Sequence, residues 1–304
     1  MLNYDQIKNK KRIFQNFTGL TIKAFLHLLP TFHRAYEQAL AQQDTQRDTP
    51  RQRQPGGGRK ATLLEASDKL LFILFYFKFY PTQEVQGFLF GLGQPQANEW
   101  IHRLTPVLNR ALGYEKQLPA RKAHQIEQVL AACPALEFII DGVERPIQRP
   151  QDKQKQKDCY SGKKKRHTNK NVLISDKRTK KVKVLGRTQP GSRHDKTITD
   201  EEAYRFPKGS RLWKDLGFQG YEPEGVTTYQ PKKKPRGGEL TAEEKAQNRA
   251  ISSKRIGVEH SIGGVKVYRI VHDVYRNHRT NYEDLIMETA CGLHNLRLDF
   301  PLAA

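Results

Sequence analysis

The sequence predicts an α/β domain with a mixed β-sheet, preceded by an all-α region. Apolar residues recur at helical spacing through about the first 115 of the 304 residues. From residue 135 onward, short β-branched and apolar runs are typical of strands, and one long helical stretch follows them. The order of three strands, a helix, two strands and a long helix indicates an α/β fold whose strands run in both directions.

Residues 1–41 are expected to form a helical segment. Thr21 is placed to cap a helix, and the apolar residues after it lie three and four apart. Pro30 is expected to kink or divide that helix. In residues 42–60 apolar side chains almost vanish while Pro and Gly accumulate, so this stretch is predicted to be a linker.

Residues 61–115 are expected to form a helix-turn-helix. A helix ending near Tyr80 is apolar on all sides and is therefore predicted to be buried. A short helix then stops at Gly91 and another begins at Gln94, and two helices joined by such a turn form this motif. The start of the second helix carries side chains that can read base edges in a major groove: Gln94, Gln96, Asn98, Glu99 and His102. The alternative is a helical hairpin that serves only packing.

Residues 130–304 carry the strand pattern. Strands are expected at 135–140, 171–175, 181–185, just before Asp215 and at 225–229, with a helix over 194–204. Thr241 and Glu244 have the spacing of a capping box, which predicts a long helix that continues past Glu259.

Three acidic residues lie where such a sheet would expose them. Asp141 is expected at the end of the first strand, Asp215 at the end of the fourth, and Glu259 inside the last helix. If the two strands are parallel neighbours, both aspartates lie side by side and the helix can add Glu259. Carboxylates this close repel one another and favour a hard divalent cation, for which Mg²⁺ fits best. The alternative for any single acid is an ordinary surface or capping role.

The charge of the chain indicates a polyanionic partner. Lys and Arg number 53 against 32 Asp and Glu, a formal net charge of +21. Residues 151–187 alone hold 14 Lys and Arg against 3 Asp. Two clusters are predicted to contact DNA, the alternative for the second being a solvated loop: Lys163, Lys164, Lys165 and Arg166, and then Lys232, Lys233 and Lys234 within 231–236.

Other features exclude several classes of protein. The three cysteines lie far apart and form no CxxC pair, which argues against a disulfide framework and a zinc ribbon. The longest apolar run, 70–77, is too short to span a membrane, and the N-terminus has no apolar segment typical of secretion. We therefore expect no membrane partner and a location in the cytoplasm, associated with the nucleoid.

Four blocks of sequence, in order, resemble the DDE superfamily endonucleases, the transposases of small bacterial insertion sequences. The first block is 138–147 followed by 160–168, and the second is the Gly-Ser-Arg-His-Asp turn at 191–195. The third is Asp-Leu-Gly-Phe-Gln-Gly at 215–220, and the fourth covers 255–263 with Asn248 before it and Lys266 after it. The helical region at 61–115 also lies where this family has its helix-turn-helix.

The resemblance implies a ribonuclease H-like fold in which Asp141, Asp215 and Glu259 are catalytic and hold two Mg²⁺ ions, with Mn²⁺ as a substitute. It implies a water-driven cut that frees a 3′-OH at each element end, followed by attack of that hydroxyl on target DNA. The expected partners are double-stranded DNA, both element ends and target, and a second copy of the chain. In a related branch of the family, a Tyr stands three residues before the position that Arg255 occupies here, and hairpin-forming chemistry relies on that Tyr. This chain has Ser252 at that position, so hairpin-forming chemistry is not expected.

Arg255, Glu259 and Lys266 repeat at helical spacing and share one face of the predicted helix. The two cations are therefore expected to grip phosphates beside the scissile bond, with solvent-facing positions as the alternative. His194 and His260 adjoin these blocks but have no partner at zinc spacing, so both are interpreted as orienting or structural residues.

Two other functions remain as alternatives to the nuclease. A DNA-binding protein derived from such an element could keep the fold without cutting DNA, although the presence of all three acids favours the enzyme. An RNA-binding protein would need an aromatic platform on a strand, whereas Tyr160, Phe218 and Tyr229 are scattered.

Overall fold

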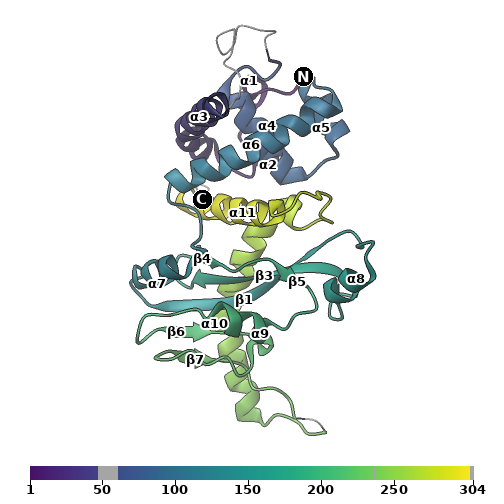
Figure 1. Ribbon diagram of the computed structural model, residues 1–304. Helices are drawn as coiled ribbons and strands as arrows, with labels where there is room; N and C mark the ends of the chain where they lie inside the picture. The colour runs from purple at the N-terminus through teal and green to yellow at the C-terminus, as the bar shows by residue number, and fades with distance from the viewer. Residues whose placement is uncertain (47–60, 236, 302–304) are drawn as a thin grey trace. The chain divides into compact units, whose positions relative to one another are not determined.

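The computed structural model describes residues 1–46, 61–235 and 237–301, apart from the side chains of residues 123–124 and 255–260. The chain divides into two compact units. The helical unit comprises Met1–Leu118, Val267–Val271 and Leu285–Ala304, and the sheet unit comprises Pro119–Lys266 and His272–Asp284. Figure 1 shows the elements of both.

The helical unit contains the following elements: α1 (Tyr4–Ile7), α2 (Lys11–Thr18), α3 (Ile22–Thr45), α4 (Ala66–Phe79), α5 (Gln83–Phe90), α6 (Gln94–Tyr114), η2 (Arg269–Val271) and most of α11 (Tyr282–Asp299). The Thr21 side chain caps α3 by accepting a hydrogen bond from the Ala24 N–H, as expected. Pro30 lies inside α3 and does not divide it, because the helix runs unbroken to Thr45. Of the linker expected at 42–60, residues 42–45 are helical, and 47–60 lie outside the described part of the chain.

The three helices expected at 61–115 are present. Residues 69–77 of α4 are buried, which agrees with a helix apolar on all sides. The Thr82 hydroxyl caps α5, and Gly91 ends it in the left-handed conformation at φ +67°. Gly87 lies so close to the turn that an added methyl group would be 2.6 Å from the Leu92 carbonyl oxygen, so α5 and the turn before α6 pack tightly.

The C-terminal helix belongs to the helical unit from Leu285 onward, although the sequence pattern grouped it with the strands that precede it. Asn109 of α6 donates a 3.1 Å hydrogen bond to the Thr289 hydroxyl of α11. Gly292 packs against Leu112 and Leu118. Periodicity identifies the buried face of such a helix but not the helices that cover it.

The sheet unit has a mixed sheet, as predicted. Its strands are β1 (Glu137–Pro146), β2 (Tyr160–Ser161), β3 (Arg166–Asp176), β4 (Val182–Leu185), β5 (Gln189–Pro190), β6 (Arg211–Trp213) and β7 (Thr227–Tyr229). The order is β2-β3-β1-β6-β7, and β4 and β5 also pair with β3. β1 is antiparallel to β3 and parallel to β6, which is parallel to β7.

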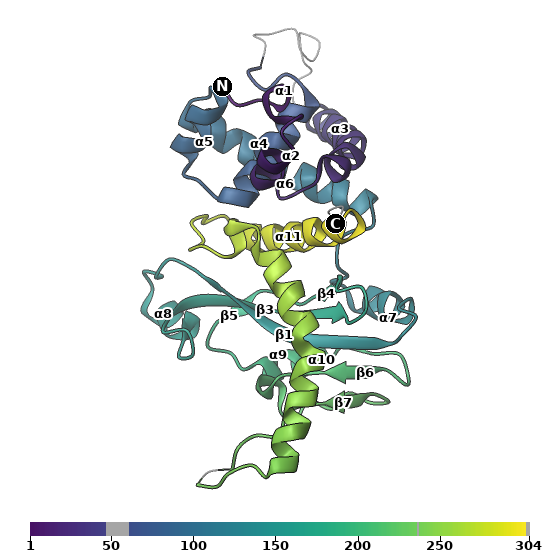
Figure 2. The same cartoon turned by 180° about the vertical axis from the view of Figure 1, so that it is seen from behind.

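Helices lie on both faces of this sheet (Figures 1 and 2). One face packs against Ile126 and Leu130 of α7 (Ala123–Ala131) and Ile198 of α9 (Asp195–Glu202). On the other face, Ile251 and Ile262 of α10 (Ala242–Lys266) pack near Trp213. Two further short helices are α8 (Lys153–Cys159) and η1 (Leu216–Phe218).

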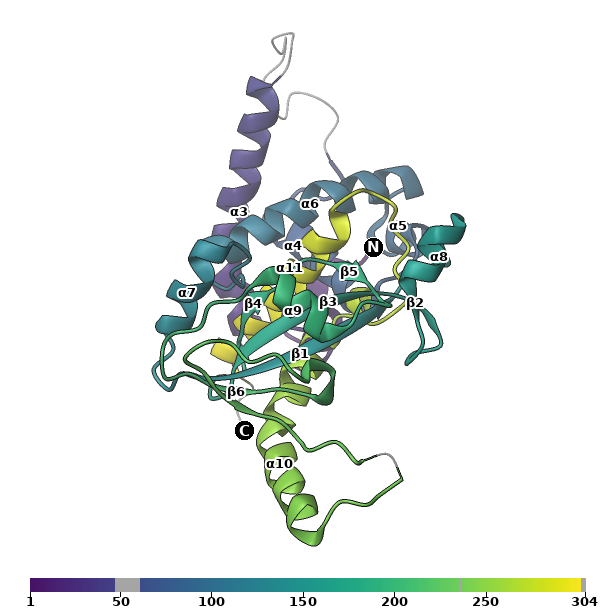
Figure 3. The ribbon, with the colours of Figure 1, turned by 60° about the horizontal axis from the view of Figure 1, so that its bottom comes forward.

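The capping box expected at the start of α10 is present. The Thr241 N–H donates to the Glu244 carboxylate at 2.9 Å, and the Glu244 N–H donates to the Thr241 hydroxyl at 3.2 Å. Figure 3 shows the chain between β7 and α10 returning to this end of the helix. None of the described helices combines the length and the apolar character that crossing a bilayer requires.

Candidate active site

Asp141 and Asp215 lie at matching positions just beyond the paired part of two neighbouring parallel strands. The pairing of β1 with β6 ends at Ile139 opposite Trp213. Asp141 lies two residues further along β1, and Asp215 lies two residues beyond the end of β6, in extended backbone. Because side chains alternate along a strand, both aspartates project on the face that carries Ile139 and Trp213, which is the α10 face. The side-by-side placement expected for parallel strands is therefore present.

Asp141 differs from expectation in one respect, because it lies inside β1 and not at its end. β1 continues to Pro146, which is paired with Thr168 of β3. The antiparallel partner thus prolongs the strand after its parallel partner has ended. The continuous apolar run in the sequence ends at Ile140, so it did not indicate this extension, although Val143 and Arg145 further along β1 are buried.

Each aspartate is held locally by the backbone that follows it. Asp141 Oδ1 accepts a 2.8 Å hydrogen bond from the Gly142 N–H. Asp215 caps η1, and its Oδ1 accepts a 2.7 Å hydrogen bond from the Leu216 N–H. Both residues are half-buried. These bonds orient the carboxylates without removing them from solvent.

A cavity of about 400 Å³ brings three of the four sequence blocks together. It is lined by residues from the first three blocks and from β3: Asp141, Gly142, Glu144, Tyr160, Ser161, Gly162, Lys163, Lys170, Gly191, Ser192, Arg193, His194, Asp195, Asp215 and Gly217. Sequence reasoning assigned no role to Glu144, Lys170 or Asp195. Glu144 and Asp195 lie within the sequence blocks at 138–147 and 191–195, and that position could have indicated a place in the site. Nothing in the local sequence distinguishes Lys170 from the other lysines.

Lys266, at the end of α10, interacts electrostatically with this site. Burial lowers the pKa of Lys266, as does the neighbouring Lys164, whereas Asp141 and Glu144 act in the opposite direction. The ammonium group thus lies within electrostatic reach of the first aspartate. The backbone of α10 passes through positions 255 and 259, but the side chains of Arg255, Glu259 and His260 lie outside the described residues.

The first basic cluster forms the tip of a hairpin. β2 and β3 pair through Ser161 and Arg166, so the residues between them make the turn. Lys163, Lys164, Lys165 and Arg166 are all exposed, and Lys163 lines the cavity. This cluster is therefore accessible to a phosphate backbone and adjoins the aspartates.

The second basic cluster is bound to α10. The Lys232 N–H donates to Asn248 Oδ1 at 2.7 Å, and Asn248 Nδ2 donates back to the Lys232 carbonyl at 3.0 Å. The Lys232 ammonium also pairs with Glu244, and Lys234 lies 3.9 Å from Glu239. Lys233 is exposed, and Arg236 lies outside the described residues. Two of these lysines therefore have acidic neighbours.

The polar residues of α6 are accessible to different extents. Gln94, Gln96 and Glu99 are exposed, whereas Asn98 is half-buried and accepts a 3.3 Å hydrogen bond from Gln83. Gln96 Oε1 accepts a hydrogen bond from the Gly93 N–H at the start of its own helix. Contact of Gln96 and Asn98 with DNA remains a prediction.

Lys214 does not share the site with the aspartate that follows it. Its side chain is fully buried, and its ammonium donates to the Tyr221 carbonyl and to the Glu222 carboxylate. Strand alternation directs it to the opposite face of the sheet from Asp215. The basic residue beside Asp215 is therefore structural.

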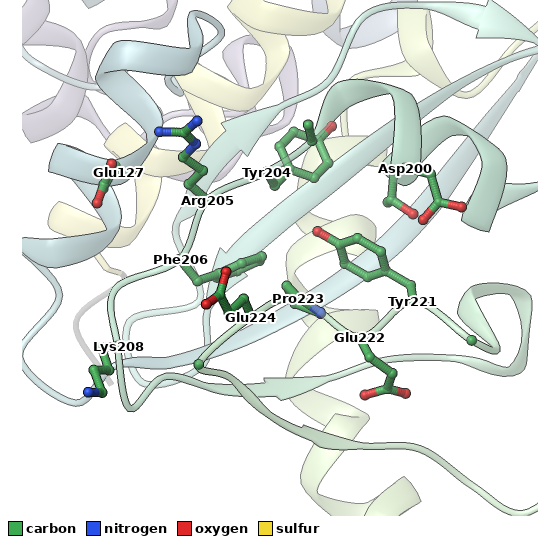
Figure 4. A pocket seen from close by; sticks show the side chains of 14 residues that line it. Glu127, Asp200, Tyr204, Arg205, Phe206, Lys208, Tyr221, Glu222, Pro223 and Glu224 are labelled. Atoms are coloured by element: carbon green, nitrogen blue, oxygen red, sulfur yellow. The ribbon is translucent and has the colours of Figure 1, made fainter.

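A larger cavity, of about 880 Å³, lies at the other end of α9. Figure 4 shows its lining, which includes Phe206 and Tyr221 together with the carboxylates of Glu127, Asp200 and Glu224. None of the residues predicted to be catalytic lines it.

The donor chemistry of the site fits a hard divalent cation. Asp141 and Asp215 offer carboxylate oxygens from adjacent strands, which are the donors that Mg²⁺ prefers. Within the described residues, no group of three or more His, Cys, Asp or Glu is arranged to hold a metal ion. The side chain of Glu259, the expected third acid, lies outside the described residues.

Comparisons with known proteins agree with the motifs. Residues 140–295 match the sequence model of the DDE superfamily endonucleases, and residues 62–113 match the helix-turn-helix of the same superfamily. A relative from Microchaete diplosiphon, named as the probable transposase for insertion sequence element IS702, is 28% identical over 253 residues, which cover 83% of this chain and 86% of the relative. No solved structure matches the chain. The family match covers more than half of the chain, from β1 into α11, and contains both Asp141 and Asp215: the chain belongs to the DDE superfamily endonucleases.

Proposed function

We propose that the protein is a transposase that binds the ends of its element and catalyses metal-dependent cleavage and strand transfer of DNA. The observation that carries this proposal is the pair Asp141 and Asp215, which lie two residues after the last paired residues of β1 and β6 and line one cavity. The endonuclease family of the chain and the transposase name of its relative support the reaction class.

Asp141, Asp215 and Glu259 would hold two Mg²⁺ ions, with Mn²⁺ as a substitute. Positions 251, 255, 259 and 262 recur at helical spacing on α10, and Ile251 and Ile262 pack on the face from which both aspartates project. This spacing supports the assignment of Glu259 as the third ligand. When bound, the metal supplies charge neutralisation and lowers the pKa of an attacking water or hydroxyl.

The basic residues of this chain would position the DNA. Lys266 and Arg255 are assigned to phosphates beside the scissile bond, and the hairpin residues Lys163, Lys164, Lys165 and Arg166 to the flanking backbone. The helix-turn-helix would read the element ends through Gln96 and Asn98, with the segment carrying Lys232, Lys233 and Lys234 as a second phosphate contact. The active assembly would be a homodimer on DNA.

Incubation of the purified protein with duplex DNA tests this proposal. The substrate carries the inverted repeats that flank the gene, a scrambled duplex serves as control, and Mg²⁺ or EDTA is added. We expect Mg²⁺-dependent nicks at the repeat boundary that leave a 3′-OH, and joining of that end to a target plasmid. Repeat-specific binding without any cleavage would instead favour an element-derived DNA-binding protein.

A further inference from the structure

The Asp195 carboxylate lies between the two glycines that follow the catalytic aspartates. Gly142 comes directly after Asp141, and Gly217 lies two residues after Asp215. A methyl group built on Gly142 would lie 2.7 Å from Asp195 Oδ1, and one built on Gly217 would overlap Asp195 Oδ2. Both segments therefore approach the same carboxylate more closely than a residue with a Cβ atom could.

The position of Asp195 is set by a buried cation on a third strand. Lys170 of β3 is only 7% exposed, and its ammonium lies 3.1 Å from Asp195 Oδ1 and 3.7 Å from Glu144 Oε1. Lys170 also donates a 2.8 Å hydrogen bond to the Arg193 carbonyl, two residues before Asp195. The ammonium thus holds both the side chain and the preceding backbone, and it compensates the charge of the carboxylate.

The turn that precedes α9 is docked on the same strand. The Gly191 N–H donates to the Thr168 carbonyl at 2.9 Å, and Gly191 approaches Thr168 so closely that any side chain at 191 would overlap it. The Thr168 hydroxyl donates in turn to Glu144 at 3.1 Å. The whole Gly-Ser-Arg-His-Asp block is therefore fixed to β3 before it presents Asp195 to the two glycines.

We propose that Asp195, held by Lys170, is a positioning residue that sets the distance between Asp141 and Asp215. The parallel pairing of β1 with β6 ends at Ile139 and Trp213, before either aspartate is reached, so backbone hydrogen bonds of that ladder do not fix their separation. Asp195 occupies the space beyond the ladder and contacts the segment after each aspartate. This inference rests on the proposed function, because it assumes that both aspartates bind one metal centre.

Binding of Mn²⁺, followed by electron paramagnetic resonance on the full-length protein, tests the assignment separately from cleavage. We expect Asp195→Asn to weaken Mn²⁺ binding by about ten-fold, as for other groups that orient metal ligands, and to raise the Mg²⁺ concentration at half-maximal cleavage by about the same factor. At saturating metal its cleavage rate should stay within a few-fold of the wild-type rate. Asp200→Asn, the same change on the exposed side of the same helix, is the control and should alter neither quantity.

Each outcome decides between roles for Asp195. Wild-type Mn²⁺ affinity in Asp195→Asn would show that the carboxylate positions nothing. Loss of Mn²⁺ binding as complete as in Asp141→Asn would make Asp195 a ligand and would also overturn the positioning role. If the wild type neither binds Mn²⁺ nor cleaves, the proposed function itself fails. If the wild type does both and Asp195→Asn is identical to it, only this inference fails.

The glycines provide a second test, which does not depend on the folding of Asp195→Asn. Gly217→Ala should weaken Mn²⁺ binding at least about ten-fold, because its methyl group displaces Asp195. Combining Gly217→Ala with Asp195→Ala removes the overlap, so the double variant should bind Mn²⁺ as well as Asp195→Ala alone. If the two substitutions instead lower the Mn²⁺ affinity additively, the shared contact is contradicted. Gly263→Ala, where a methyl group meets nothing within 4 Å among the described side chains, is the matched control.

Discussion

Helix α9 has a cavity at each end, and the two cavities differ in the side chains that line them. The smaller, at Asp195, contains two aspartates in register, a buried lysine and an exposed basic hairpin. The larger, at Asp200, has more than twice the volume and is lined by aromatic rings and by carboxylates from α7, from α9 and from loops. We therefore propose the smaller cavity as the reactive site, on the placement of its aspartates and not on its volume.

The largest expected effect comes from removing one catalytic carboxylate charge. Asp141→Asn and Asp215→Asn should each lower the cleavage rate at least about 10³-fold, equivalent to about 4 kcal/mol of activation free energy. DNA affinity should stay within a few-fold, because these acids are proposed to hold metal and not phosphate. Single-turnover cleavage and a gel-shift titration measure the two quantities. Near-wild-type cleavage by either variant would remove that aspartate from the site.

A smaller loss is expected at Lys266. Lys266→Ala should lower the single-turnover rate on pre-bound DNA by about ten-fold, because it removes a cation from the neighbourhood of Asp141 and the scissile phosphate. Mn²⁺ affinity should change little. An unchanged rate would show that Lys266 serves only the packing of α10 on the sheet.

The two basic clusters should differ in their contribution to DNA binding. Replacing Lys163, Lys164 and Lys165 with Gln should reduce the slope of log affinity against log salt by about two to three, since each lysine in the exposed hairpin neutralises a phosphate. The same change at Lys232, Lys233 and Lys234 should reduce it by about one, because Glu244 and Glu239 already compensate two of them. Equal slopes for the two triple variants would refute this distinction.

The smallest effect is expected in the larger cavity. Within the described residues the Tyr221 hydroxyl has no hydrogen-bond partner, and burial together with the nearby Asp200 raises its pKa, so the group stays protonated. Tyr221→Phe should leave cleavage unchanged and alter the free energy of unfolding by no more than about 1 kcal/mol, in the stabilising direction. Thermal melting and the cleavage assay measure both. A large loss of cleavage would mean that the larger cavity participates in the reaction.

Local patterns in the sequence predicted the elements well, because caps and periodicity act over a few residues. The Thr241–Glu244 capping box and the helices before residue 115 follow from such patterns. The parallel pairing of β1 with β6 was only a condition in the sequence argument, because it joins segments that are distant in sequence. The role of Lys170 could not be found in this way, because its partners Asp195 and Glu144 are distant in sequence and meet it only through strand pairing. The assignment of α11 to the helical unit likewise depends on long-range packing against α6.

The central claim is that Asp141 and Asp215 bind the same catalytic metal directly. Asp141→Cys and Asp215→Cys test it most directly, because a thiolate binds Mg²⁺ poorly and accepts softer ions. We predict that both variants are inactive in Mg²⁺ and recover cleavage in Mn²⁺, while the corresponding Ala variants stay inactive in both metals. Equal activity of the Cys and Ala variants in Mn²⁺ would contradict direct coordination by these two residues.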